Sequence, residues 1–430
     1  MPLPESTRRA YQEILKEELL LAMGCTEPIS IAYGAAILRH ALGEVPEAIS
    51  VRLSGNIIKN VKSVIVPATG GLHGIEAAVS AGIIAGCPER ELEVLTGLRP
   101  EDTEKIRGYL KFCRFTLSEM ESPFTFDMIL EGSAGTRTAL VHIQGNHTGV
   151  CRVERCGEDI TARYLRGCAQ QTVETTERSV LNVKDIVQFA RETDLEPVKP
   201  YLLRQVEKNL AIAEEGLRGN YGASIGKILY RGGEASLRDK ARAYAAAGSD
   251  ARMSGCELPV CIISGSGNQG MTASLPVVVY ARELGCSQEE MLRALIVSDL
   301  ITIHQKTGIG CLSAYCGAVS AGCGSGCGIC FLLGGGYEDV AHTLVNAVAI
   351  LSGTICDGAK ASCAAKIAMA VEAGLLGLDM TNAGKQFYGG DGIVTKGVEN
   401  TIRNVGQLAR EGMCQTDKEI IRIMLGEKIC

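Results

Sequence analysis

Apolar positions recur at helical spacing near the start of the chain. Between residues 5 and 22 they lie three or four positions apart, as in an amphipathic helix: Tyr11, Ile14, Leu15, Leu19 and Leu20. A second helical run covers 29–42, and its small residues permit close packing. The sequence Gly-Cys-Thr-Glu-Pro at 24–28 predicts a kinked turn between the two helices, with Cys25 inside it.

The pattern changes to strand-like alternation after residue 47. Residues 48–55 and 63–71 read as strands, and a glycine-rich turn opens a helix over 75–85. Residues 93–112 predict a short strand and a helix, and further strands follow in 114–130 and 138–155. Together these runs predict an α/β domain over 48–165.

Helical periodicity dominates the rest of the chain. The predicted helices cover 183–193, 198–216, 236–247, 274–284, 288–303, a cysteine-rich pair, 364–376, 395–410 and 416–425. The expected fold class is therefore α+β, with a mainly helical C-terminal domain over 166–430 and the smaller α/β domain. The N-terminal helices, 1–47, are expected to pack on the helical domain.

Composition narrows the possible partners. The 430 residues are 46 % apolar, enough for a sizeable core, but only 4 % aromatic with no Trp, which favours closely packed helices built from small aliphatic residues. Lys plus Arg is 43 against 49 acidic residues, a net charge of −6, and no basic run is present. Nucleic acid is therefore not an expected partner.

The location is predicted to be cytoplasmic. The first 25 residues carry charges throughout and lack the apolar region and cleavage site of a signal peptide. Residues 308–336 contain no charge and are long enough to span a bilayer, but their many Gly and Ser residues favour a buried helix pair. In a reducing compartment, eighteen cysteines point to packing, catalysis or metal binding rather than to disulfides.

Seven of those cysteines lie between residues 308 and 366. Cys323, Cys327 and Cys330 share one helix face, a spacing typical of small-residue packing. Cys316 and Cys356 differ because each lies at a helix edge or a glycine-bounded turn. Thiols from distant turns are what an iron–sulfur cluster requires, whereas a compact zinc ribbon is absent.

A polar glycine-rich segment, 264–270, follows an apolar run. Its glycines let backbone amides turn inward, and its side chains add hydrogen-bonding groups that suit a carboxylate or phosphate: Ser264, Ser266, Asn268 and Gln269. An ordinary glycine-rich turn is the alternative.

Two other positions are candidates for contact with a ligand. Lys59, between Asn56 and Asn60 in an apolar run, is a candidate base or carboxylate partner if it is buried, and an ordinary solvated lysine if it is not. His147 lies in a glycine-rich turn where a substrate contact is plausible, as does His73.

Seven motifs in order along the chain carry a family resemblance. They begin at Gly24, Asn56, Gly145, Ser249, Ser264, Ser313 and Ile355, and read GCTEPI, NIIKN, GNHT, SDARM, SGSGNQG, SAYC and ICDGA. The chain resembles the L-cysteine desulfidase family, relatives of the iron–sulfur L-serine dehydratase α chain.

The resemblance implies a [4Fe-4S] enzyme that eliminates a β-substituent from a small amino acid to give pyruvate and ammonia, with sulfide as the third product from L-cysteine. The family's cysteine motifs fall on Cys25, Cys316 and Cys356, with Cys311 or Cys363 as competitors for the first. Lys59 becomes the candidate Cα base.

The remaining candidates would hold the substrate. The segment 264–270, Asn56 and Asn60 would bind its carboxylate and amine, and Arg252 would supply charge unless it pairs with Asp250. Cys430, the last residue, is a candidate for reaching the open iron when substrate is absent, although a frayed tail is the ordinary alternative.

Other functions stay open at this point. L-serine dehydratase is the alternative within the same chemistry. A pyridoxal phosphate lyase, with 264–270 as phosphate cradle, lacks a convincing lysine motif, and a cluster-containing thiol or amino-acid sensor would not turn over substrate. The partners expected are a small amino acid and no nucleic acid or membrane, and a homodimer is left open.

Overall fold

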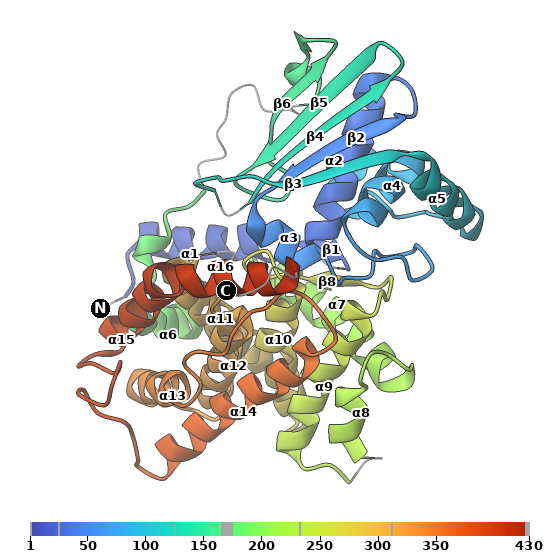
Figure 1. Ribbon diagram of the computed structural model, residues 1–430. Coiled ribbons are helices and arrows are strands. Elements are labelled where there is room, and N and C mark those ends of the chain that lie inside the picture. Colours follow the sequence, from blue (N-terminus) through green and yellow to red (C-terminus); the bar gives the residue numbers. More distant parts are fainter. Residues whose placement is uncertain are drawn as a thin grey trace.

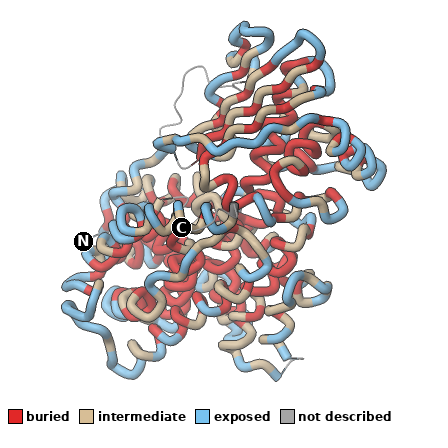
Figure 2. The backbone as a smooth tube through the Cα atoms, in the orientation of Figure 1, coloured by how far each residue is buried: buried red, intermediate tan, exposed pale blue. Residues whose placement is uncertain are grey.

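The computed structural model describes residues 2–24, 26–124, 126–164, 175–231, 234–310 and 313–425. A sheet with helices on one face forms one part of the molecule, and a helical bundle forms the other (Figure 1). Buried residues concentrate inside the bundle and between the sheet and its helices (Figure 2). The predicted α+β class, with a mainly helical C-terminal part, is confirmed.

The main sheet has six strands in the order β3-β2-β4-β5-β6-β7. Only β2 and β3 are parallel, and the other neighbours are antiparallel. The strands are β2 (Ala48–Leu53), β3 (Arg114–Glu119), β4 (Asp127–Ala134), β5 (Arg137–Gln144), β6 (Val150–Arg155) and β7 (Glu158–Asp159).

Helices cover one face of this sheet. The helical elements of this part are α2 (Thr26–Leu42), α3 (Gly55–Val61), α4 (Ile75–Ala85), η1 (Pro88–Glu93), α5 (Pro100–Phe112) and η2 (Thr161–Arg163). In β2, inward residues such as Ile49 and Val51 are buried while their neighbours are half-exposed, so one face packs and the other meets solvent.

The bundle contains nearly all remaining elements. Its helices are α1 (Glu5–Glu18), η3 (Arg178–Val180), α6 (Val183–Glu192), α7 (Lys199–Arg218), α8 (Ile225–Tyr230), α9 (Leu237–Met253), α10 (Gly267–Glu283), α11 (Gln288–Ile309), α12 (Gly317–Leu332), α13 (Tyr337–Ile350), α14 (Cys363–Asn382), α15 (Val398–Gln407), η5 (Leu408–Gly412) and α16 (Cys414–Leu425). A short antiparallel pair, β1 (Leu21–Met23) with β8 (Pro259–Cys261), ties the N-terminal segment to it.

The two N-terminal helices belong to different cores. Tyr11 and Leu15 of α1 pack in the bundle. Ile29 and Leu38 of α2 instead pack beneath the sheet. Apolar or small residues lie on nearly every side of α2. Its sequence pattern therefore does not predict whether it packs against the bundle or against the sheet.

Several predicted boundaries differ in the structure. Residues 93–99 form no strand, and 63–71 contribute only an isolated bridge between Ile65 and His73. Residues 56–60, which separate two of the predicted strands, lie in helix α3 (Gly55–Val61). Helix α10 begins at Gly267 rather than at 274, so half of the glycine-rich segment is a helix start.

The uncharged segment 308–336 supplies α12, which packs in the bundle. No helix of the described residues is long and apolar enough to cross a membrane. A Cβ atom on Gly322 would lie 2.2 Å from the carbonyl oxygen of Ala370, and one on Gly374 would lie 2.2 Å from that of Gly322. The backbones of α12 and α14 are therefore in direct contact. As predicted, Cys323, Cys327 and Cys330 pack in this core.

Asp299 in α11 is a fully buried carboxyl group within the bundle. Its Oδ1 accepts a hydrogen bond of 3.0 Å from Gln205 Nε2, while its Oδ2 and Gln205 Oε1 have no partner among the described residues. Burial raises the pKa of Asp299 to about 7. A proton on the carboxyl group supplies the donor that this pair lacks.

We expect Asp299→Asn to stabilise the protein above pH 7 by roughly 2–4 kcal/mol. Between about pH 4 and pH 7 the unfolded carboxyl group ionises while the folded one keeps its proton, so folding loses stability as pH rises through this window. Urea unfolding at pH 5 and pH 8 measures the difference. Glu104→Gln, at an exposed position on α5, is the control. An Asp299→Asn variant that keeps the wild-type pH dependence would contradict the assignment.

Candidate active site

A cavity of about 100 Å³ lies between the sheet part and the bundle. Nine of the residues predicted from sequence line it: Asn60, His147, Arg252, Ser264, Ser266, Asn268, Gln269, Cys316 and Cys356. A larger hollow of about 640 Å³ lies on the open face of the sheet, but none of the predicted residues borders it. The smaller cavity is therefore the candidate site.

Four helices begin at this cavity. Residues from the first turns of α2, α10, α12 and α14 all line it, including Thr26, Asn268, Gly317 and Cys363. Each helix N-terminus carries unpaired backbone N–H groups and a partial positive charge. Arg252, from the end of α9, adds a full charge. Such a cavity favours anions, including a carboxylate and thiolates.

Cys316 and Cys356 are brought together by a backbone bridge. Tyr315 and Ile355 form an isolated antiparallel pair, in which Cys316 N donates to the carbonyl of Thr354 at 2.9 Å and Cys356 N donates to that of Ala314 at 2.7 Å. This bridge therefore brings together the thiols of two turns that lie forty positions apart in the sequence.

The two thiols share a hydrogen bond and differ in acidity. The hydrogen bond from Cys316, with the positive charges of Lys59 and Lys306, lowers the pKa of Cys356. The same hydrogen bond, with burial, raises the pKa of Cys316. One thiolate beside one thiol is a pair that a metal can recruit by displacing a single further proton.

Cys363 approaches the same pair from the start of α14. Its thiol contacts the carbonyl oxygen of Gly358 at 3.7 Å, and it lines the cavity. Cys25, Cys311 and Cys430 lie outside the described residues. Thr26, next to Cys25, also lines the cavity, and its hydroxyl donates to the carbonyl of Gly265 at 2.9 Å.

The segment 264–270 forms a tight turn and then the first turn of α10. Ser264 and Gly265 have positive φ angles of 47° and 75°, and the Ser266 side chain caps the helix by accepting from Gln269 N. A Cβ on Gly267 would lie 2.6 Å from Arg252 Nε, and one on Gly317 would lie 2.6 Å from the Gln269 amide carbon. Glycine at both positions is what lets Arg252 and Gln269 reach the cavity.

Several polar atoms around the cavity lack partners. Among the described residues no hydrogen bond reaches Arg252 Nε, Asn268 Oδ1, Gln269 Oε1 or His147 Nε2, although all four atoms are buried. Burial without a partner costs roughly 1–3 kcal/mol for each such group. This concentration of unsatisfied groups at one cavity is what a site built for a polar ligand would have.

Comparison with known proteins agrees with this geometry. A profile of the serine dehydratase alpha chain matches residues 89–422. The chain belongs to the serine dehydratase alpha-chain family. It is also 53 % identical to a UPF0597 protein of Desulfitobacterium hafniense, over 97 % of both chains, and 44 % identical to a UPF0597 protein of Treponema denticola, over 99 % of this chain and all of the other. The names of these relatives state no reaction.

Two predicted site residues of this serine dehydratase alpha-chain relative do not line the cavity. Lys59 on α3 is buried, and its ammonium group pairs with Asp417 of α16. Asn56, one helical turn earlier, has a buried Oδ1 without a partner among the described residues. Because 55–61 is a helix, Asn60 faces the cavity while Lys59 points toward α16. The positive charge of Lys59 nevertheless lowers the pKa of Cys356.

Other lining residues were not predicted. Glu27, on α2, accepts a hydrogen bond of 2.9 Å from Asn60 Nδ2, and Lys306, on α11, is buried beside the cysteines. Tyr315 and Lys366 also line the cavity. The sequence pattern could have marked Lys306 as a candidate, because it is a charged residue near the end of a mostly apolar helix. Glu27 lies within the GCTEPI motif that begins at Gly24.

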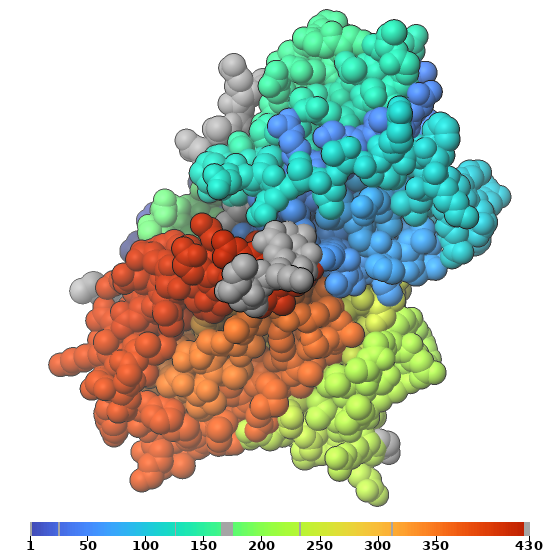
Figure 3. Space-filling view, in the orientation of Figure 1, coloured from blue at the N-terminus to red at the C-terminus, as the bar shows by residue number. Residues whose placement is uncertain are grey.

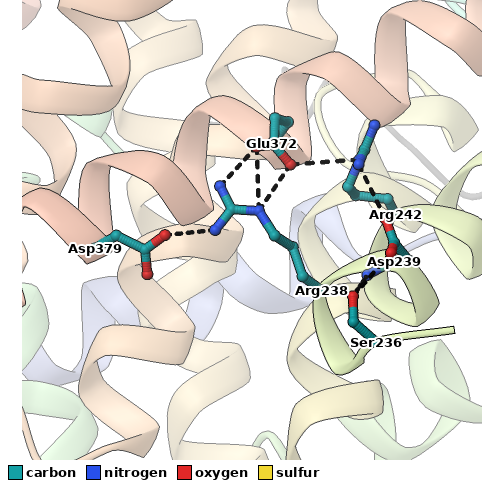
Figure 4. A network of polar contacts seen from close by, with 6 residues as sticks. All are labelled: Ser236, Arg238, Asp239, Arg242, Glu372 and Asp379. Carbon is teal, nitrogen blue, oxygen red and sulfur yellow. Dashed lines mark hydrogen bonds and ion pairs between the residues drawn. The ribbon is translucent and has the colours of Figure 1, made fainter.

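An ion-pair network fixes the helices that carry part of the site. Arg238 on α9 donates to both carboxylate oxygens of Glu372 on α14, at 2.6 and 2.9 Å, and also reaches Asp379 (Figure 4). Arg242 lies 3.5 Å from the same Glu372. The network joins the helix that ends near Arg252 to the helix that begins at Cys363.

The donor set suits an iron–sulfur cluster with a third ligand still to be assigned. Among the described residues no group of three or more His, Cys, Asp or Glu side chains is arranged to hold a metal ion. Cys316 and Cys356 supply two thiols in an electropositive, enclosed cavity. Cys25, Cys311 and Cys363 are the candidates for the third.

Proposed function

We propose that the chain is an iron–sulfur-dependent L-cysteine desulfidase, which converts L-cysteine to pyruvate, ammonia and sulfide. The observation that carries the proposal is the pairing of Cys316 and Cys356 at a cavity where four other buried polar atoms have no hydrogen-bond partner among the described residues. Family membership supports a lyase, since a dehydratase is one. L-serine dehydratase is the second candidate, favoured by the same family match.

Cys316, Cys356 and a third cysteine (Cys25, Cys311 or Cys363) would hold a [4Fe-4S] cluster. When bound, such a cluster supplies a Lewis acid for the departing sulfur. The protein's own contribution begins with substrate binding. Arg252 and the side-chain amides of Asn268 and Gln269 would receive the α-carboxylate, assisted by the start of α10.

His147 is the proposed acceptor of the Cα proton, in place of Lys59. Burial lowers the pKa of His147, so its ring is neutral at pH 7 and able to take a proton. Lys59 is engaged with Asp417 and does not line the cavity. Loss of the Cα proton and of the Cβ–S bond leaves 2-aminoacrylate, and water then releases pyruvate and ammonia.

Anaerobic purification, followed by iron and acid-labile sulfide analysis and by substrate assays, tests the proposal. We expect sulfide and pyruvate in equal amounts from L-cysteine. Pyruvate from L-serine with little turnover of L-cysteine would support the second candidate instead. An iron-free protein that still eliminates sulfide would contradict both.

Replacing Arg252 by Met is expected to lower kcat/KM about 100-fold, mainly through KM, because removing one partner of a buried charge contact costs 2–5 kcal/mol. Steady-state kinetics with L-cysteine measures the effect. Lys240→Met, on the same helix but outside the cavity lining and outside the network of Arg238 and Glu372, is the matched control. Equal losses in both variants would show that the effect is structural rather than local.

A further inference from the structure

Strand β3 lies at the margin of the six-stranded sheet, next to β2 (Figure 1). Among the described residues β2 is its sole strand neighbour. The N–H of Arg114 donates to Glu47 O at 3.0 Å, and that of Met120 donates to Leu53 O at 2.9 Å. Even-numbered residues therefore turn their backbone groups toward β2. In a parallel strand, the odd-numbered ones, Phe115, Leu117 and Glu119, turn theirs outward.

This edge lacks two of the usual protections against pairing, proline and a β-bulge. It contains no proline, and its register with β2 runs without a bulge from Arg114 to Glu119. Large apolar side chains are exposed beside it: Phe112 at 63 %, Leu117 at 40 % and Phe124 at 45 %. An unpaired strand with these features is a template for another strand.

The charges along β3 select both the partner and its direction. Basic residues lie at its start, Lys111 and Arg114, and acidic residues at its end, Glu119 and Glu121. A second β3 in antiparallel orientation brings each basic end beside an acidic end, whereas a parallel one brings like charges together. The edge is therefore complementary to itself under two-fold symmetry.

The outward backbone groups also restrict the register. For the two strands to bond, residues whose backbone groups point outward must face each other. A two-fold axis that passes between two residues would instead pair outward residues with inward ones, so it is excluded. A two-fold axis at Leu117 pairs the backbone groups of all three outward residues. Phe115 then faces Glu119 of the other copy, and Leu117 faces Leu117. The exposed Leu117 side chains meet on the axis, and Arg114 faces Met120 of the other copy.

We propose that β3 joins two copies of this chain into a homodimer, paired antiparallel about a two-fold axis at Leu117, with one continuous sheet across both subunits. This surface is independent of the proposed reaction. The cavity between sheet and bundle plays no part in it.

Light scattering during gel filtration of the full chain tests the interface. Wild type is expected to elute as a dimer. Leu117→Lys places two like charges on the axis and Leu117→Pro removes an outward N–H donor, so each is expected to shift the protein to monomer. Circular dichroism melting checks that both variants stay folded. A wild-type monomer, or folded variants that remain dimeric, would overturn the proposal.

Oxidative cross-linking tests the axis. At an antiparallel hydrogen-bonded pair the Cα atoms lie about 5.5 Å apart, within disulfide range. Leu117→Cys is expected to give a covalent dimer beyond the wild-type background, while Thr116→Cys and Ser118→Cys are not, since each faces the other residue across the axis. Cross-linking through Thr116→Cys or Ser118→Cys, without Leu117→Cys, would overturn the proposed axis.

Discussion

Replacing Cys356 by Ser is expected to abolish both iron retention and lyase activity. Cys356 is the more acidic thiol of the pair, because a hydrogen bond from Cys316 and the charges of two lysines favour its thiolate. Serine keeps the shape but is not deprotonated near neutral pH. The loss should exceed the roughly 100-fold that removal of an outer-shell partner causes at a metal site.

Iron content, acid-labile sulfide and sulfide release, all measured anaerobically, check this prediction. Cys323→Ala is the matched control, since Cys323 packs within α12 in the core and does not line the cavity. It should lose stability but keep its iron. A Cys356→Ser protein with full iron would mean that Cys356 is not a ligand. If Cys323→Ala loses iron equally, the effect comes from misfolding.

Replacing His147 by Gln is expected to lower kcat roughly 10²–10⁴-fold, the usual contribution of a positioned base. Burial is the main reason that the pKa of His147 is lowered, and the charge of Arg252 adds to it, although Glu27 opposes both. A base must be neutral to accept a proton. Wild-type kcat/KM should therefore stay flat from pH 8 to below pH 6.5, and fall only as His147 becomes protonated.

The pH profile separates a base from a merely structural histidine. In the His147→Gln variant the acid limb should disappear together with the activity, while iron content stays at the wild-type level. His304→Gln is the control, because His304 pairs with Glu399 and does not line the cavity. Substantial activity in the His147→Gln variant, with the acid limb unchanged, would assign the proton transfer to another group.

Local signals in the sequence accounted for much of the site. The distinction between cysteines on a helix face and cysteines in turns separated Cys323 from Cys316 and Cys356, because turns at helix starts leave thiols near unpaired amides. The polarity of 264–270 likewise marked a segment whose side chains needed partners. Both features depend on short-range chemistry, which sequence records directly.

Long-range relations were not predictable in this way. Lys59 pairs with Asp417, 358 positions away. No property of residues 56–60 predicts that partner. Helix α3 is too short for its periodicity to stand out, so Asn56 and Asn60 were expected to act together although they face different surroundings. The convergence of four helix N-termini also depends on tertiary structure. The sequence indicates where a helix begins, but not that the four N-termini lie close together in space.

The contact between α12 and α14 has a consequence for how substrate enters. With backbone against backbone, neither helix can slide or rotate without the other, so Cys316 and Cys363 form the rigid side of the cavity. The opposite side, with Thr26, Asn60 and His147, belongs to the sheet part. Figure 3 shows that part seated against the C-terminal segment, where α16 packs on α3.

Substrate admission should therefore be a hinge motion in which the sheet part tilts away from a bundle that does not deform. Amide hydrogen exchange would record it as slow exchange throughout α12 and α14, and faster exchange in α3 and α16. Fast exchange in α12 would contradict this picture. The glycines that bring two helices into contact thus decide which half of the enzyme stays fixed and which half moves.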